Sequence, residues 1–232
     1  MTVAAIMQPT YLPWAGYLAM IEKVDIFVFL DSVQFARRSW QQRNRIKSAN
    51  GELMLTVPVH RKGLRDQKIQ NVRIEREAGF ANKHIAAIDM NYRGSAAFDA
   101  ASPELYTILS NGHEKLCDLS LDVIGWLMVK LGCNTPTVRS SQLAATGKKD
   151  ALLLSICREI GADTYLSAPA SREYLDASQC FPGSGVEIEY HQYDHPVYPQ
   201  LHGAFISSLS AIDMLFNCGS SFRQTLLSGL PR

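Results

Sequence analysis

The sequence lacks the features of a membrane or secreted protein. No stretch approaches the roughly 18 consecutive apolar residues that a membrane-spanning helix needs. No positively charged segment precedes the first apolar run, so we expect no signal peptide. Cysteine is scarce, with five scattered residues and no pair at the spacing of a zinc or redox motif. These absences predict a cytoplasmic protein in a reducing compartment.

Several catalytic signatures are missing as well. No HxGH motif follows the first apolar segment, which argues against nucleotidyl transfer. No serine lies in a G-x-S-x-G turn, which argues against a serine nucleophile. His191, His195 and His202 have no cysteine or carboxylate at a recognised ligand spacing, so we expect no metal site.

The sequence does contain a regular alternation of apolar segments. Its 232 residues are 47% hydrophobic, which is enough to bury a core. Residues 3–7 and 26–30 are apolar throughout, as in strands covered on both faces, and residues 14–24 show helical spacing. The pattern predicts an α/β fold: a mostly parallel, Rossmann-like central sheet, an inserted basic β-hairpin and a helical C-terminal half. We expect residues 1–76 to form the strand–helix–strand unit with the hairpin, and 77–232 to pack on it as one compact domain.

The inserted hairpin is predicted by Asn50-Gly51, because Asn-Gly favours the positive φ angles of a tight turn. Residues 45–47 and 53–59 are then its two strands. Beyond a polar loop, the apolar positions of residues 69–74 predict a further short strand.

The net charge of +1 conceals a basic block. The segment from Arg37 to Arg73 contains ten Lys or Arg residues and only two acidic residues, Glu52 and Asp66. Such a block suggests a local anionic ligand more than a general nucleic-acid coat. Arginine forks fit phosphate oxygens, and a tryptophan can stack on a base or sugar; the alternatives are a solvated face or a structural network with carboxylates. The residues expected to bind phosphate are Arg37, Arg38, Trp40, Arg43, Asn44, Arg45 and Lys47.

The carboxyl ends of the parallel strands are the expected ligand edge. Gly16 there would let a ligand approach the backbone, next to a helix N-terminus that favours an anion. Core packing is the alternative for the aromatic residues of this turn. The residues expected at this edge are Gln8, Tyr11, Trp14, Tyr17, Gln34, Ser141 and Ser167.

Six runs of the sequence together resemble the WbqC-like family of bacterial and phage proteins: QPTYLPWAGYL, VDIFVFLDSVQF, RRSWQQRNRIK, SSQL, YLSAPASREYL and LSAIDMLFNCG. They span nearly the whole chain. Members in surface-polysaccharide clusters look like transferases acting on activated sugars, and phage relatives are proposed to transfer amino acids onto phosphorylated hydroxymethyl-pyrimidines in DNA. Tyr198 and Gln200 are similar to a YPQ element of the family and are expected to bind substrate. This chain departs from the family where residues 168–171, Ala-Pro-Ala-Ser, replace a Gly-rich turn.

Three residues are candidates for the base that accepts a proton from an amine. Asp31 ends a buried apolar segment, although a carboxylate beside arginines is more often a simple countercharge. His195 lies in a loop rich in Pro, Tyr and His, and the ordinary pKa of a histidine is near neutrality. His84 matches a family position on the first long helix.

The resemblance and the basic block together predict a transferase that joins a small amino acid, with glycine as the first candidate, to a phosphate-activated acceptor. The favoured acceptor is a phosphorylated or pyrophosphorylated 5-hydroxymethyl-uracil in phage DNA. One alternative is N-acyl or aminoacyl transfer to a nucleotide-linked amino sugar, and another is a non-catalytic nucleic-acid or nucleotide-binding module. No cofactor is required if the acceptor is already activated. The expected partners are this acceptor and a free amino acid, without a membrane, and a homodimer is left open.

Overall fold

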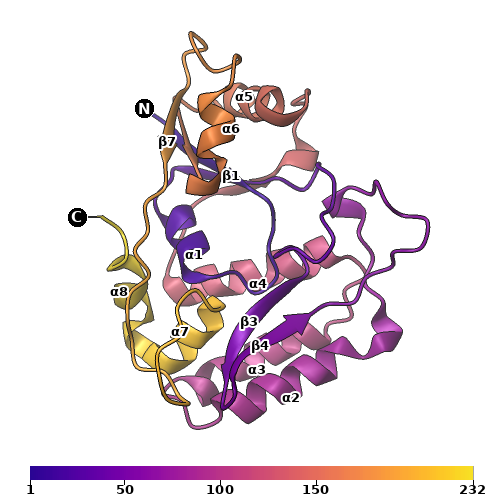
Figure 1. The fold of residues 1–232 in the computed structure, drawn as a ribbon, viewed down its shortest axis with the longest axis vertical. Coiled ribbons are helices and arrows are strands. Elements are labelled where there is room, and N and C mark those ends of the chain that lie inside the picture. The colour runs from indigo at the N-terminus through magenta and orange to yellow at the C-terminus, as the bar shows by residue number, and fades with distance from the viewer. Residues whose placement is uncertain (232) are drawn as a thin grey trace.

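Five parallel strands form the central sheet of the computed structural model, which describes residues 1–231 (Figure 1). Their order is β5-β2-β1-β6-β7. The chain starts in the middle, adds strands on one side, and then returns to add β6 and β7 on the other. The connections therefore diverge between β1 and β6, and ligands of open α/β sheets bind at the carboxyl ends of such strands. The strands are β1 (Val3–Met7), β2 (Ile26–Phe29), β5 (Thr137–Arg139), β6 (Thr164–Ser167) and β7 (Glu187–Tyr190).

Helices cover both faces of this sheet, which explains why its inner strands are apolar throughout. Ala4, Ile6 and Val28 point to the face covered by α5 (Lys149–Glu159) and α6 (Arg172–Asp176). Alternate residues of the same strands, such as Ala5 and Phe27, belong to a larger core with α1 (Ala15–Glu22) and α4 (Leu116–Leu131). Figure 1 shows α5 and α6 on one side of the sheet and α1 and α4 on the other. The predicted α/β class and parallel sheet are confirmed.

The predicted basic hairpin is also confirmed and lies apart from the sheet. β3 (Arg43–Ser48) pairs antiparallel with β4 (Gly51–Thr56). Gly51 has a φ of 98°, which suits glycine at the tight turn. Ile46 of β3 and Leu55 of β4 are buried. β3 contacts α2 (Phe80–Tyr92) and α7 (Ala211–Cys218).

Two further helices complete the helical part of the molecule, α3 (Phe98–Ser110) and α8 (Phe222–Leu227). Short 3₁₀ helices join the larger elements: η1 (Ile69–Asn71), η2 (Arg76–Ala78), η3 (Ser140–Gln142), η4 (Pro169–Ser171) and η5 (Gly219–Ser221). Within residues 1–231 no helix combines the length and the apolar character needed to cross a membrane. The sheet takes two strands from residues 1–76 and three from the remainder; the division of the chain at residue 76 stays a prediction.

The strand predicted over residues 69–74 is wrong. Ile69, Val72 and Ile74 are buried as expected, but Ile69 lies in η1, and in the segment after it Arg73 and Ile74 form only isolated β-bridges, to Lys115 and Val59. The backbone of this segment bonds to the loop that follows β2: the Ile69 amide donates to Val33 (2.9 Å) and the Gln70 amide to the Asp31 carbonyl (3.0 Å). These bonds to a distant loop take the place of the regular ladder of a strand.

Candidate functional site

The largest cavity described in the molecule is a cleft of about 1050 Å³ at the carboxyl edge of the central sheet. The segments that follow β1, β2 and β6 contribute to it, so it lies where the strand connections diverge. Topology and shape therefore point to the same place. Its polar and aromatic lining residues are Gln8, Thr10, Ser32, Gln34, Ser39, Trp40, Gln41, Lys68, Lys148, Lys149, Tyr165, Ser171 and Tyr174.

The cleft is cationic. Lys68, Lys148 and Lys149 line it, and across residues 1–231 its lining includes no carboxylate. None of these three lysines forms an ion pair with any described residue. Unpaired cations around a concave surface favour an anionic ligand, because low-dielectric walls concentrate their field.

The N-terminus of α5 opens onto the same cleft. Lys148 is its N-cap and supplies no side-chain hydrogen bond, while the Asp150 carboxylate of the first turn accepts a hydrogen bond from the Ala151 amide. Lys149 has a φ of 54°, a left-handed conformation that non-glycine residues rarely adopt. Gly147 precedes them with a φ of 121°. Two lysines are thus presented at the positive end of a helix dipole.

Polar side chains from the first strand edge supply further hydrogen-bonding groups. The Gln41 Nε2 donates to Gln8 Oε1 at 2.7 Å, and the Ala36 amide donates to Gln41 Oε1 at 3.0 Å. Gln8 is therefore held by Gln41 at the cleft wall. Thr10 also lines the cleft, and its buried Oγ1 has no hydrogen-bond partner within the described chain.

Asp31 lies outside this lining and its carboxylate is fully paired. It is completely buried. Its Oδ2 accepts from Arg139 Nε at 2.7 Å and from Ser141 Oγ at 2.8 Å, and its Oδ1 accepts from Ser140 Oγ at 3.1 Å. The surroundings are those of a countercharge joining β2 to β5. The predicted catalytic role of Asp31 and the predicted ligand role of Ser141 stay predictions, although the two residues do contact one another.

The basic cluster predicted from the sequence divides into several environments. Arg37 and Arg38 are exposed, and Arg37 Nη2 donates to the Arg61 carbonyl at 2.9 Å. Arg43 leaves a buried Nε without a partner in the described chain. Arg45 forms an ion pair with Glu52 at 2.8 Å. From this cluster Trp40 lines the cleft, and the arginines do not.

Two members of the cluster are buried in the fold itself. Asn44 donates from Nδ2 to the Leu12 carbonyl at 2.6 Å and so fixes the turn after β1. Lys47 is almost fully buried, and its Nζ donates to the carbonyls of Gly203 (3.3 Å) and Ala204 (2.6 Å). Lys47 alternates with Arg43 and Arg45 along β3, but the loop before α7 covers its side chain.

Tyr198 and Gln200 belong to a buried network around Asp213. The Asp213 carboxylate accepts from the Tyr92 hydroxyl, the Tyr198 hydroxyl and Gln200 Nε2, each at 2.7 Å. Burial raises the pKa of Asp213, and these three hydrogen bonds oppose the rise. The Lys47 amide donates to the Tyr92 hydroxyl at 2.9 Å, which ties β3 to the same network. The predicted substrate contacts of Tyr198 and Gln200 stay untested by this arrangement.

His84 lies in the core below the hairpin. Its Nδ1 is 2.8 Å from the Tyr11 hydroxyl, and the ring of Phe80 packs edge-on against it. Burial lowers the pKa of His84 to about 4, although a hydrogen bond with the Thr56 backbone opposes the shift. Tyr11 itself is fully buried. Neither ring is among the residues that line the cleft.

His195 and Trp14 belong to an aromatic cluster near the C-terminal loop. Their rings are parallel within 14°, with centroids 6.4 Å apart, and burial lowers the pKa of His195. Gly16 has no room for a ligand: an added Cβ would lie 2.2 Å from the Trp14 ring. The glycine thus permits the indole to approach, which corrects the expectation that it permits a ligand to do so. Tyr17 is buried and donates to the Gln8 carbonyl at 3.2 Å.

Ser167 ends β6 beside the cleft and is buried, with its Oγ bonded to the Tyr165 hydroxyl at 3.3 Å. Of the residues predicted from the sequence, Gln8, Gln34 and Trp40 therefore reach the cleft itself. None of its three lysines was among the residues selected from the sequence, although Lys148 and Lys149 stand directly at the start of α5. Sequence reasoning also missed Arg139, the ion-pair partner of Asp31, and Asp213.

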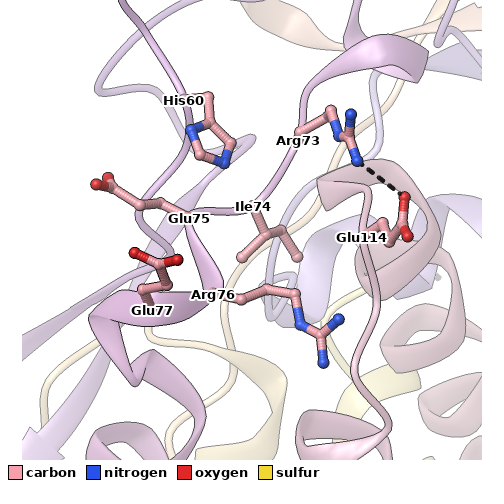
Figure 2. Close-up of a pocket in the computed structure, with 7 residues that line it drawn as sticks. All are labelled: His60, Arg73, Ile74, Glu75, Arg76, Glu77 and Glu114. Carbon is pink, nitrogen blue, oxygen red and sulfur yellow. Dashed lines mark hydrogen bonds and ion pairs between the residues drawn. The ribbon is translucent and has the colours of Figure 1, made fainter.

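A smaller pocket of about 250 Å³ lies elsewhere on the surface (Figure 2). Three glutamates, Glu75, Glu77 and Glu114, line it together with His60, Arg73 and Arg76. Figure 2 shows the ion pair between Arg73 and Glu114, 3.2 Å long. The mixed charge makes this pocket a poorer anion site than the cleft. Among residues 1–231 no three His, Cys, Asp or Glu side chains come together in a metal-binding arrangement.

The comparisons with known proteins agree on one family. The model of the WbqC-like protein family matches residues 8–225. The uncharacterized protein Rv1507c of Mycobacterium tuberculosis is 33% identical over 222 residues, which cover 95% of each chain. No solved structure matches the chain significantly. Because the family match covers the hairpin, four of the five sheet strands and most of the cleft lining, the chain belongs to the WbqC-like protein family.

Proposed function

We propose that the protein is a transferase that joins a small amino acid, with glycine as the first candidate, to a phosphate-activated acceptor bound in the cationic cleft. The observation that carries the proposal is the set of three unpaired lysines that line the cleft, two of them at the N-terminus of α5. Their place at the diverging strands of the sheet is where α/β proteins bind phosphorylated ligands.

The reaction needs charge stabilisation more than a covalent intermediate. The amine nitrogen attacks the carbon that bears the phosphate, the new C–N bond forms, and the C–O bond to the phosphate breaks. Negative charge then develops on the departing phosphate or pyrophosphate. Lys68, Lys148 and Lys149 would stabilise that charge from positions fixed before the reaction.

The proton released by the amine goes to water or to the departing phosphate in this scheme. No histidine or carboxylate is among the residues that line the cleft within the described chain. Asp31 is held by Arg139 and two serines, and burial keeps His84 neutral. A role for Asp31, His84 or His195 as the base would require the substrate to reach beyond the cleft lining.

Two acceptors fit the cleft through different steps. The substitution above applies to an activated 5-hydroxymethyl-uracil. With a nucleotide-linked amino sugar, the sugar amine would instead attack the carboxyl carbon of an activated acyl or aminoacyl donor, the amide bond would form and the activating group would leave. An activated 5-hydroxymethyl-uracil in phage DNA would place its phosphates on the lysines, with Arg37 and Arg38 exposed beyond the cleft for the flanking strand. A nucleotide-linked amino sugar is favoured by a different observation: a cavity of about 1050 Å³ has the size of a site for one small ligand. Both acceptors are nucleotides that carry phosphate, and both require the same cationic site.

A turnover assay with detection by mass spectrometry tests the proposal. Purified protein is offered a pool of free amino acids with DNA containing pyrophosphorylated 5-hydroxymethyl-uracil, or a pool of amino acids activated at the carboxyl group as thioesters with a nucleotide-linked amino sugar. A product whose mass equals DNA plus one amino acid minus pyrophosphoric acid establishes the first acceptor and identifies the donor. An aminoacylated sugar nucleotide establishes the second.

Variants of the cleft connect any product to the proposed site. Lys68→Ala and Lys148→Ala should each lower turnover at least ten-fold, because each removes a charged contact to the departing phosphate. Lys83→Ala is the matched control, since Lys83 is an exposed lysine of α2 outside the cleft. Salt-sensitive nucleic-acid binding without any product would contradict the transferase and leave a binding module.

A further inference from the structure

Two aromatic side chains remain exposed in a protein that otherwise buries its aromatic residues. The chain has three Trp, nine Tyr and nine Phe. Within residues 1–231 the exposed ones are Trp40, with 48% of its surface accessible, and Tyr174, with 40%. Both line the cationic cleft. Scattered exposed apolar residues need no explanation, but here the exposed aromatic residues coincide in one cavity.

The two rings come from different parts of the cleft wall. Trp40 lies between β2 and β3, and its carbonyl accepts from the Tyr11 amide at 3.1 Å, which anchors this segment to the turn after β1. Tyr174 lies on α6, which follows β6. The aromatic surface is therefore attached to both sides of the diverging strands.

The indole of Trp40 is already oriented on one face. The guanidinium of Arg45 lies 5.3 Å from the ring centroid, in the range of a cation–π contact. Arg45 is itself fixed by the carboxylate of Glu52 at 2.8 Å and the carbonyl of Ser208 at 3.3 Å. A ring fixed in this way loses little conformational entropy when a second planar group stacks on its exposed surface.

We infer that Trp40 and Tyr174 bind the base of a nucleotide whose phosphates lie on the three lysines of the cleft. The inference rests on the proposed function and adds the class of acceptor and the residues that recognise it. A phosphorylated ligand without an aromatic ring would be held by the lysines alone and would gain nothing from two exposed aromatic side chains. A nucleotide uses both surfaces, because every base has a π-face that stacks on aromatic side chains.

Calorimetric titration with two probes separates the two surfaces. Inorganic pyrophosphate measures binding by the lysines, and uridine diphosphate adds a nucleoside to the same two phosphoryl groups. We expect uridine diphosphate to bind at least ten-fold more tightly than pyrophosphate. Trp40→Ala should weaken uridine diphosphate about ten-fold and leave pyrophosphate unchanged, in the range measured for single stacked bases.

Conservative and matched variants keep this test clear of folding defects. Trp40→Phe and Tyr174→Phe retain a ring and should restore most of the nucleotide affinity that the alanine variants lose. Met54→Ala is the control, because Met54 is 40% exposed like Tyr174 but lies on β4, outside the cleft lining. It should change neither affinity.

The outcomes distinguish the inference from the function on which it rests. Equal affinities for the two probes, or equal loss of both in Trp40→Ala, would overturn the base-binding role while the anion site survives. Failure of both probes to bind would remove the anion site as well. A single-stranded oligonucleotide bearing pyrophosphorylated 5-hydroxymethyl-uracil then identifies the source of the base: tighter binding than uridine diphosphate points to DNA, and weaker binding to a free nucleotide, with Trp40→Ala weakening either.

Discussion

The buried carboxylates of this molecule and the lysines of its cleft differ in whether they have partners. Asp31 and Asp213 are completely buried, and each carboxylate accepts at least three hydrogen bonds from named partners. The cleft cations Lys68, Lys148 and Lys149 are exposed and have no ion-pair partner in residues 1–231. Satisfied buried charges fix the positions of elements, while unsatisfied exposed charges remain available for a ligand.

Removing the carboxylate of Asp31 tests the buried half of this comparison and should have the largest effect. Asp31→Ala leaves Arg139 and two serines without their partner at the junction of β2 and β5. We expect a loss of about 3–5 kcal/mol in the free energy of unfolding, as for other broken buried pairs. Urea denaturation measures it. Glu173→Ala, at an exposed residue of α6, should change stability by less than about 0.5 kcal/mol.

If Asp31 is instead a base for an external substrate, the result differs. Asp31→Asn retains most of the hydrogen-bonding shape but loses the charge. A variant that folds with nearly normal stability and lacks turnover would contradict the countercharge interpretation. A strongly destabilised variant would support it.

Acid should weaken the fold through His84, with the next largest effect. Burial lowers the pKa of His84 to about 4 from an ordinary value of 6.5. The unfolded chain therefore binds a proton below about pH 6.5 while the folded protein does not, so stability falls as the pH decreases toward 4. The contribution lost between about pH 7.5 and pH 4.5 is roughly 2–3 kcal/mol.

The measurement is the free energy of unfolding in urea across this pH range, for the natural protein and for His84→Gln. Other acidic groups titrate in the same window, and subtraction of the two profiles isolates the histidine. His84→Gln should flatten the profile whatever its stability at neutral pH. Parallel profiles would show that folding does not lower the pKa of His84, and that the side chain is more accessible than its contact with Tyr11 indicates.

The fold was largely predictable because its signals are local. Apolar segments at 3–7 and 26–30 became β1 and β2, and Asn50-Gly51 became the turn between β3 and β4. Residues 69–74 failed because buried apolar positions in a short segment do not distinguish a strand from a 3₁₀ turn. Here the bonds to the loop after β2 decide, and no local pattern reports them.

The site was less predictable because its parts are far apart in the chain. The strand-end rule identified the right edge, and Gln8 and Gln34 do line the cleft. The concentration of basic residues along the sequence was a poorer guide to the site. It selected Lys47, whose side chain the distant carbonyls of Gly203 and Ala204 cover. It counted Lys68 within the basic block without selecting it, and it passed over Lys149; the two lysines converge only because the parallel strands end together.

Lys149→Gly tests whether a cleft lysine serves ligand binding and not the fold, and it should have the smallest effect on stability. Glycine adopts a φ of 54° without the strain that a lysine backbone carries, so we expect stability to be unchanged or up to about 1 kcal/mol higher. Pyrophosphate affinity should fall about ten-fold, because one charged contact is lost. Lys148→Ala is the matched control: Lys148 has an ordinary φ of −138°, so its loss should weaken binding without any gain in stability. A Lys149→Gly protein that is less stable, or that binds pyrophosphate normally, would show that this lysine serves the fold and would remove the distinction between the two sets of charges.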